Sequence, residues 1–455
     1  MTAGLVLFSR DLRVEDHPAL AAASDESHQV VPAFVLDDAI LSSDFARPNR
    51  ISFLLDALRD LDSSLRRLGA RLIVRRGDVV EQAMALMEDT RAEALYMSAD
   101  VSGYAHGRKR RLAQACAAHG VGFRAFPGTT VVPPGEITPA GADHYRVFTP
   151  YLRRWHAAER RPLARVPGRL DFPEGLDAGR IPDVEELVHG AISPNLPIGG
   201  AAEGRRRASR WLDEGLAHYA ARRDDLAGDD SSRLSPWLHF GCLSALELAT
   251  EASSRDGGDA FVRQLCWRDF HHQVHNATPG LPREDYRGHG DRWRSDDADL
   301  QAWKDGCTGY PVVDAGMRQL LSEGWMHNRA RLISASFLVK DLYLDWRLGA
   351  QHFWDLLVDG DMANNSGNWQ WVAGTGNDTR PNRVFNPLRQ AERFDPTGDY
   401  VRRYVPELAG IEGPGVHRPW DLGLERSTND YPEPIVDHAE AAAEFRRRRS
   451  PDSGD

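Results

Sequence analysis

The sequence predicts an N-terminal α/β domain with a doubly wound parallel sheet, followed by an all-α domain. Two observations support this fold class. Short β-branched runs alternate with amphipathic helical patterns over residues 3–126, which is the order of elements in a parallel sheet covered by helices. Over residues 201–420 the apolar residues recur at helical spacing, and the strand pattern disappears.

The α/β domain is expected to span residues 1–128. Its clearest helix is expected over 50–68, where apolar residues recur at helical spacing until Gly69 stops them. The turn at 9–13 lacks the GxGxxG pattern, so a dinucleotide site of the usual type is not expected. The carboxyl ends of the strands still offer a place for a ligand. The expected strands are 5–8, 30–36, 71–74, 94–97 and 121–126, and the further helices are 78–88 and 104–118.

Three segments complete the expected domain organisation. Residues 129–200 are rich in proline and too long for a bare loop, so we expect a connector packed over the surface, with one short helix over 150–158. Residues 201–420 form the helical domain. Residues 421–455 are a charged tail expected to fray, and its arginine run at 446–449 is typical of a solvated face rather than of a nucleic-acid contact.

Composition limits the classes of function. The 455 residues carry a net charge of −11, so binding of nucleic acid would need a local basic face rather than overall charge. The four cysteines are scattered without a CxxC pair, which favours a reducing compartment and argues against zinc or iron–sulfur sites. No apolar run approaches ~20 residues, and no signal peptide is found. A cytoplasmic monomer without a membrane span or metal is expected.

Residues 359–371 (DGDMANNSGNWQW) are the most unusual stretch. Asp, Asn and Gly favour caps and turns, so the run is expected to be a poor core helix. Large aromatics are seldom exposed in a cluster, so it is also a poor surface loop. The stretch alone supports two alternatives equally: a polar lining against a flat heteroaromatic ligand, or a helix N-terminus that buries Trp369 and Trp371.

The spacing in this stretch resembles the flavin-binding motif of the DNA photolyase/cryptochrome family. Five further stretches resemble the same family in the family's order. They are 232–236 (SRLSP), 267–270 (WRDF), 308–315 (TGYPVVDA), 324–329 (GWMHNR) and 385–387 (FNP). The resemblance is strongest to bacterial cyclobutane pyrimidine dimer photolyases of class I type, with some features of DASH-type cryptochromes. It implies that the all-α domain binds FAD.

The family resemblance also implies an activity: light-driven repair of UV-damaged DNA, by electron transfer from reduced FAD to a flipped-out pyrimidine dimer. The alternatives are a blue-light receptor of cryptochrome type, a DASH-like enzyme limited to single strands, and a (6-4) photolyase with an unusual site. A second, light-harvesting chromophore, either a deazaflavin or a folate, is possible in the α/β domain.

Several residues are assigned to FAD by resemblance. Hydroxyls and N–H groups before Pro236 suit phosphate oxygens, although without the resemblance an ordinary serine cap is the better explanation. Arg331 is expected to pair with Asp359, and Asn365 matches the position that faces flavin N5. The assigned contacts are Tyr219, Ser231, Ser232, Arg233, Leu234, Ser235, Gln264, Trp267, Arg268, Asn328, Arg331, Asp359, Asp361 and Asn365.

Catalysis and DNA binding are assigned in the same way. Trp369, Trp346 and Trp293 match the family's electron relay, in order from flavin to surface, and Asn365 and Gln264 complete the catalytic set. Photolyases are among the enzymes known to take the target base out of the stack. The expected DNA contacts are Trp267 and Trp371, which would flank the flipped dimer, with Asn328, Arg329, Leu332 and Gln390. A basic segment carrying Arg380, Arg383, Arg389 and Arg393 is expected to clamp phosphates.

Two positions depart from the family. Dimer-repairing relatives usually have Glu where this chain has Gln264, and Met where it has Leu332.

Three histidines could suggest a metal site. His271 and His275 lie at i,i+4 spacing, but no third metal ligand is evident. We therefore interpret them, with His272, as helix-face residues near the DNA side.

Overall fold

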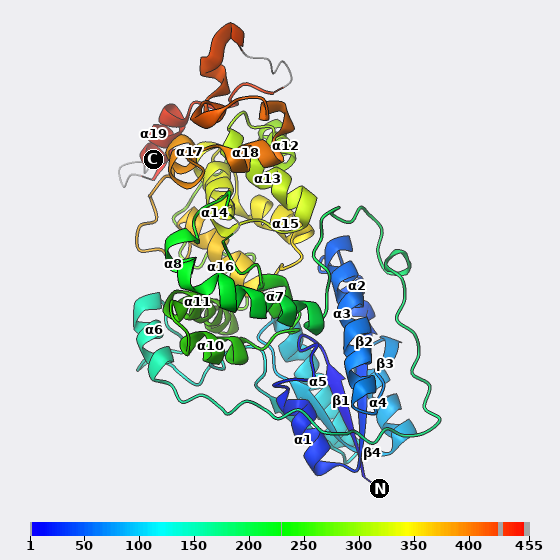
Figure 1. Ribbon diagram of the computed structural model, residues 1–455. Coiled ribbons are helices and arrows are strands. Elements are labelled where there is room, and N and C mark those ends of the chain that lie inside the picture. Colours follow the sequence, from blue (N-terminus) through cyan, green and yellow to red (C-terminus); the bar gives the residue numbers. More distant parts are fainter. Residues whose placement is uncertain (1, 229, 426–430, 450–455) are drawn as a thin grey trace.

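The N-terminal domain contains the expected five-stranded parallel sheet (Figure 1). A computed structural model describes residues 2–228, 230–425 and 431–449. The strand order is β3-β2-β1-β4-β5, so the switch in winding direction lies between β1 and β4. All five expected strands are confirmed. Their bounds are β1 Ala3–Phe8, β2 Gln29–Asp37, β3 Ile73–Gly77, β4 Ala92–Ser98 and β5 Gly122–Phe126.

Helices cover both faces of this sheet, as a doubly wound fold requires. The three helices expected from periodicity are confirmed within a few residues. Two others were not expected, because one is very short and the other uses mainly alanine as its apolar residue, which weakens the pattern. The helices are α1 Pro18–Glu26, α2 Asp38–Leu41, α3 Pro48–Arg67, α4 Val79–Thr90 and α5 Gly103–Ala118.

The connector runs along the outside of the α/β domain as an extended chain (Figure 1). Its short helix, α6 Phe148–Ala157, is confirmed, and a single 3-10 turn follows at Val184–Glu186. Backbone hydrogen bonds fasten it to the domain: Leu170 N donates to Leu68 O at 2.6 Å, and Val74 N donates to Ala178 O at 2.8 Å. The connector is therefore part of the packed surface.

The second domain is helical, and helix α16 lies at its centre. Helices α11, α14 and α15 all pack against α16, which brings together segments far apart in the sequence. Its α-helices are α7 Ala201–Glu214, α8 Tyr219–Arg222, α9 Ser235–His239, α10 Ala245–Ser253, α11 Gly258–Ala277, α12 Asp297–Asp305, α13 Pro311–Glu323, α14 Asn328–Ser336, α15 Trp346–Leu356, α16 Met362–Ala373, α17 Pro387–Phe394 and α18 Asp399–Tyr404. Shorter 3-10 or π segments are η2 Leu216–His218, η3 Phe337–Asp341, η4 Pro406–Leu408, η5 Gly413–His417 and η6 Pro419–Glu425.

The charged tail contains an ordered helix, which corrects the expectation that it frays. Helix α19 spans His438–Arg448, and Asp437 caps it by accepting a hydrogen bond from Glu440 N at 2.9 Å. Ala442 and Phe445 are buried, and the helix packs on η3. The charged residues of this segment obscured its narrow apolar face, formed by Ala442 and Phe445, which packs the helix onto the domain. Residues 426–430 and 450–455 of the tail lie outside the described residues.

Buried arginines join the two domains. Arg13 is 1% exposed and donates to Gly241 O at 2.8 Å and to Gly128 O at 2.9 Å. Arg50, on α3, is fully buried beneath Trp354 and donates to Leu357 O at 2.9 Å. Burial lowers the pKa of Arg50 to about 9. One hydrophobic core runs continuously across this interface, so the domains form a single packed unit. Across the described ranges, no helix is long and apolar enough to span a membrane.

Candidate active site

Within the stretch 359–371, residues 362–371 form most of α16, which corrects the expectation that the stretch makes a poor helix. Asp361 supplies the N-cap, accepting from Asn364 N at 2.9 Å and from Asn364 Nδ2 at 2.8 Å. Trp369 is 2% exposed, whereas Trp371 is half-buried. Of the two alternatives, the structure shows the helix N-terminus, and it also leaves polar groups beside the helix that a ligand could use.

Asp361 joins the two domains electrostatically. Arg10, just beyond β1, donates to Asp361 Oδ2 at 2.6 Å, and His272 Nε2 lies 3.3 Å from both carboxylate oxygens. Burial would raise the pKa of Asp361, but His272 and Arg10 hold that pKa well below its usual range. A carboxylate has about four acceptor sites. The amide groups of Asn364, the guanidinium and the imidazole already occupy them, so Asp361 chiefly orders the start of α16.

The expected pair between Arg331 and Asp359 is confirmed. Arg331 donates to Asp359 Oδ2 at 2.8 Å and to Met326 O at 2.9 Å. Asn365 lies in the first turn of α16 and donates through Nδ2 to Ala350 O at 3.0 Å. Its Oδ1 accepts no hydrogen bond from the described part of the chain and remains available to a ligand.

The segment Ser231–Ser235 leads into the short helix α9. Arg233 adopts a left-handed backbone with φ +51°, pairs with Glu323 at 2.7 Å, and lies 4.3 Å over the Trp325 ring. Ser235 Oγ accepts from Trp325 Nε1 at 3.1 Å. Ser231 Oγ is buried and has no partner among the residues that the structure describes. The positive charge of Arg233 is therefore compensated, while the Ser231 hydroxyl is unused.

Three other predicted FAD contacts, Leu234, Ser232 and Tyr219, lie in the same region of the helical domain or just before it in sequence. The Leu234 side chain is 1% exposed and belongs to the core, so only its backbone can reach a ligand. Leu234 N lies 3.4 Å from Ser232 Oγ, which places that hydroxyl inside the same turn. Tyr219 is half-buried against Trp211 and Phe261, and burial raises its pKa to about 12.

Helix α11 presents Gln264, Trp267 and Arg268 at i, i+3 and i+4 spacing. The Trp267 ring stacks on Phe148 of α6, with centroids 3.6 Å apart and planes at 3°. Arg268 donates to Thr129 O at 2.6 Å, which ties α11 to the connector. Gln264 is half-buried, and no described residue hydrogen-bonds its side chain. Sequence reasoning did not find Phe148, because its partner Trp267 lies 119 positions further along the chain and no local pattern connects the two.

The three histidines of α11 are buried: His271, His272 and His275 are 5%, 0% and 1% exposed. His272 lies 3.3 Å from Asp361, and the His271 ring faces that of Trp267 with centroids 5.8 Å apart. Their position near the DNA side stays a prediction. Burial lowers the pKa of His271 to about 4. Within the described ranges, no group of three or more His, Cys, Asp or Glu side chains could hold a metal ion.

Of the three tryptophans of the predicted relay, only the outermost is partly exposed. Trp369 and Trp346 are buried, while Trp293, in the coil before α12, is half-buried. Gly349 of α15 lies against Trp369, and a Cβ at that position would fall 2.2 Å from the ring, so glycine permits this close packing. Trp346 Nε1 donates to Asp285 Oδ1 at 2.9 Å. The relay role of the three tryptophans stays a prediction.

The predicted DNA contacts vary in availability. Asn328 is exposed at the start of α14, and Leu332 is half-buried on the same helix. Arg329 pairs with Asp224 at 2.8 Å. Gln390 keeps a buried Oε1 without a partner in the described parts of the chain. The predicted clamp residues Arg380, Arg383, Arg389 and Arg393 are all exposed.

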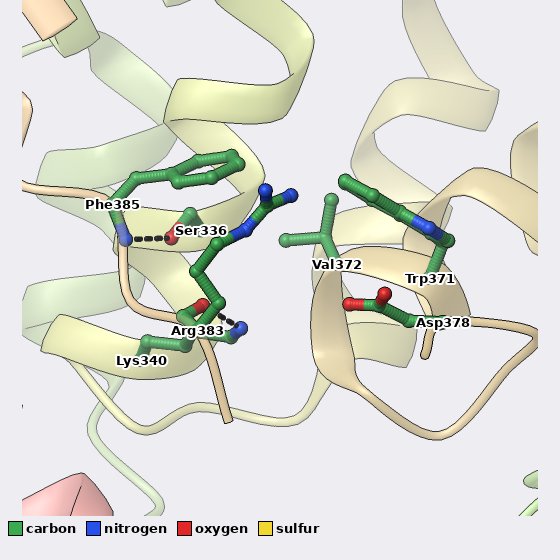
Figure 2. A pocket seen from close by; sticks show the side chains of 7 residues that line it. All are labelled: Ser336, Lys340, Trp371, Val372, Asp378, Arg383 and Phe385. Atoms are coloured by element: carbon green, nitrogen blue, oxygen red, sulfur yellow. Dashed lines mark hydrogen bonds between the residues drawn. The ribbon is translucent and has the colours of Figure 1, made fainter. Parts of the chain in front are cut away.

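Trp371 lines a small hollow together with Arg383 and Phe385 (Figure 2). The Arg383 guanidinium lies 5.2 Å from the Trp371 ring centroid and 4.8 Å from that of Phe385. Lys340 closes the base of the hollow by donating to Pro381 O and to Arg383 O. An exposed cation therefore lies against the Trp371 ring.

Arg10 and Asp100 are the site residues that sequence reasoning missed. They follow β1 and β4, the two strands that flank the switch in winding direction, and their side chains approach to 3.4 Å. Ligands of open α/β sheets bind at this point, so the strand order would have indicated them. A cavity of about 370 Å³ opens nearby, lined by Asp100, His106, Lys109 and Glu136 among others.

Comparison with known proteins identifies the family. Residues 4–168 match the family model described as DNA photolyase, and residues 261–450 match the FAD binding domain of DNA photolyase. A deoxyribodipyrimidine photo-lyase from Streptomyces griseus is 51% identical over 457 residues, covering 99% of this chain and 100% of the relative. The chain belongs to the DNA photolyase family.

Solved photolyases share the whole fold. A class III photolyase from Agrobacterium tumefaciens superposes with a TM-score of 0.92 at 31% identity, covering 98% of this chain and 97% of the other. An archaeal photolyase from Sulfolobus tokodaii, solved with two FAD molecules, gives a TM-score of 0.86 at 31% identity and covers 98% and 99%. The predicted fold class, an α/β domain followed by a helical FAD-binding domain, is confirmed.

The residues of this photolyase fit FAD. The buried Ser231 hydroxyl and the Asn365 Oδ1 have no partner in the described chain, and such groups are normally satisfied by a ligand or by water. Ser232 and Ser235 follow Ser231 in the chain, and Asp359, paired with Arg331, lies six positions before Asn365. Together they supply donors and acceptors suited to the polar atoms of a flavin dinucleotide.

Proposed function

We propose that this photolyase uses light to split cyclobutane pyrimidine dimers in UV-damaged DNA. The observation that carries the proposal is the likeness to a deoxyribodipyrimidine photo-lyase at 51% identity, over 99% of this chain and 100% of the relative. Trp267 and Trp371 add flat aromatic surfaces beside α16, as recognition of an unstacked base requires. We further expect a cytoplasmic monomer, with a second chromophore, deazaflavin or folate, near the 370 Å³ cavity.

Each group of residues has a defined task in this proposal. FAD, when bound, supplies light absorption and electron exchange. Asp361 and Arg10 fix the start of α16, so that Asn365 is held in one position along the helix. Trp267, immobilised by its stack on Phe148, forms a rigid wall that lowers the entropy cost of ordering a base. The exposed arginines after α16 bind backbone phosphates without reading sequence.

A panel of defined lesions tests the proposed substrate. Reduced, FAD-loaded protein is illuminated with matched oligonucleotides that carry one cyclobutane dimer in a duplex, the same dimer in a single strand, or one (6-4) lesion. We expect repair of the duplex dimer to be the fastest. Preference for the single strand would indicate a DASH-like enzyme, and repair of the (6-4) lesion alone would overturn the proposal.

Gln264 is expected to limit the efficiency of repair. An amide donates and accepts hydrogen bonds but supplies no proton, whereas a carboxylic acid can donate one to a carbonyl that gains charge. The difference between the two contacts is on the order of 1.5–3 kcal/mol at most. We expect Gln264→Glu to raise the number of dimers split per absorbed photon, with little change in binding of the lesion in the dark.

The matched control for this change is Gln301→Glu, which adds the same charge on the exposed surface of α12. Quantum yield is measured by chromatography of the repaired strand, and binding by gel shift under red light. A yield that is unchanged or lower in Gln264→Glu would show that the pocket is adapted to glutamine.

A further inference from the structure

A buried lysine lies directly beneath the segment that carries two of the predicted clamp arginines. Residues 377–385 follow α16 and contain no helix or strand, so contacts with neighbouring elements must set their shape. Lys340, in η3, is 3% exposed, and its Nζ donates to Pro381 O at 3.3 Å and also to Arg383 O. Two of the three ammonium donors are therefore spent on the backbone of this one segment.

Two further contacts hold the same segment. Phe385 N donates to the Oγ of Ser336, the last residue of α14, at 3.4 Å. Gly374, which ends α16, lies so close to the segment that a Cβ there would fall 2.6 Å from Pro381 O. The segment is therefore fastened between the end of α16 on one side and α14 with η3 on the other.

The side chain of Arg383 leaves this backbone on the side away from Lys340. Figure 2 shows it extending between the rings of Trp371 and Phe385, over which its guanidinium lies. Arg383 is exposed, whereas Lys340 is enclosed and cannot itself reach a phosphate. Lys340 thus fixes the point from which Arg383 reaches Trp371.

Holding an amine at this place is unfavourable. The Phe445 ring of α19 lies 5.5 Å from Lys340 Nζ and helps to bury it. Burial and the nearby Arg449 lower the pKa of Lys340 to about 7, although Asp378 and Asp341 act in the opposite direction. An apolar side chain would avoid that cost but would leave both backbone carbonyls without their donor.

We propose that Lys340 is a positioning residue for DNA binding. It holds residues 381–385 so that Arg383 and Trp371 form one preformed surface for the damaged strand. The proposal deepens the proposed function and rests on it. A preformed surface binds more tightly because its ordering cost is met before the DNA arrives. Loss of Lys340 should therefore weaken binding and leave the light-driven step on the bound dimer unchanged.

A binding experiment separates these two effects. Lys340→Met keeps the aliphatic stem and removes the donors. FAD-loaded protein is titrated under red light into a labelled duplex that carries one cyclobutane dimer, and fluorescence anisotropy gives Kd. We expect Kd to rise about tenfold. Flavin absorbance, and the yield per photon with the duplex fully bound, should not change. Lys304→Met, the same substitution on α12, should bind as the native protein does.

Two measurements test whether Lys340 acts through the segment. Arg383→Ala should weaken binding, and the double variant Lys340→Met/Arg383→Ala should bind within about twofold of Arg383→Ala alone. Trypsin can cut after Arg383, because valine follows it, but is blocked after Arg380 by Pro381. We expect cleavage after Arg383, identified by mass spectrometry, to be several times faster in Lys340→Met without DNA. Lys340→Gln, which keeps two donors, should lie between the native protein and Lys340→Met in both assays.

The outcomes distinguish this inference from the proposed function. Native affinity in folded Lys340→Met, or effects of the two substitutions that multiply in the double variant, would overturn it. Loss of FAD from both Lys340→Met and Lys340→Gln would show a general structural role and overturn it too. If the native protein does not bind the duplex, the proposed function fails, while unchanged cleavage after Arg383 would refute the hold of Lys340 on the segment by itself.

Discussion

Replacing Trp369 with phenylalanine should abolish most light-driven reduction of the bound flavin. The substitution keeps an aromatic ring in a site that is 2% exposed and closely packed against Gly349, so the fold should survive. A barrier raised by only about 1.4 kcal/mol slows a step tenfold, and phenylalanine is harder to oxidise than tryptophan by far more than that. Photoreduction in the presence of an external donor, followed by absorbance, measures the effect.

The same variant should repair DNA almost normally once its flavin is chemically reduced, because the relay serves reduction rather than repair. Trp237→Phe is the matched control: Trp237 is also 2% exposed and packs edge-on against Phe53, away from the predicted relay. Photoreduction of Trp369→Phe at the native rate would mean that electrons reach the flavin by another route.

Removing the Asp361 carboxylate should empty the site of FAD. Asp361→Ala deletes the cap of α16 and leaves Arg10 without its 2.6 Å partner, at a combined cost on the order of 3 kcal/mol. The first turn of α16, which carries Asn365, would then lose its fixed position. We expect flavin occupancy to fall to a small fraction of the native value, measured as the ratio of flavin to protein absorbance after dialysis.

Two further variants show which property of Asp361 matters. Asp361→Asn keeps an acceptor for the cap but removes the charge, and we expect intermediate occupancy. Asp100→Ala also removes a partner of Arg10, at 3.4 Å, but leaves α16 untouched, so occupancy should stay high. Circular dichroism checks that each variant is folded. Full occupancy in a folded Asp361→Ala protein would refute a role for this carboxylate in binding FAD.

Periodicity predicted the fold where it was regular. The helix over 50–68 and the five strands were located within a few residues, because the helix shows a clear apolar periodicity and the strands are short β-branched or aromatic runs. Helix α16 was expected to be poor, since its first turn is built from capping residues, and tertiary packing on α11, α14 and α15 outweighs that weak propensity. Helix α19 was hidden by its charge, because Ala442 and Phe445 alone form its buried face.

The site was predictable where the contacts are local or carried by motifs. The Arg331–Asp359 pair followed from the family resemblance, and the structure shows it. The bond between Arg10 and Asp361 joins residues 351 positions apart, and no local pattern could reveal it. The histidines of α11 were interpreted as helix-face residues, and no local pattern indicated that all three are buried, with His272 beside Asp361.

The most direct test of the central claim is illumination of the reduced, FAD-loaded protein with a duplex carrying one cyclobutane dimer. Intact pyrimidines are counted by chromatography, with dark and oxidised samples in parallel. We predict that dimers disappear only in the light and only with reduced flavin, over many turnovers, with no net loss of reducing equivalents. Dimers that persist under illumination, in protein shown to bind that duplex and to hold reduced FAD, would contradict the assignment as a dimer photolyase.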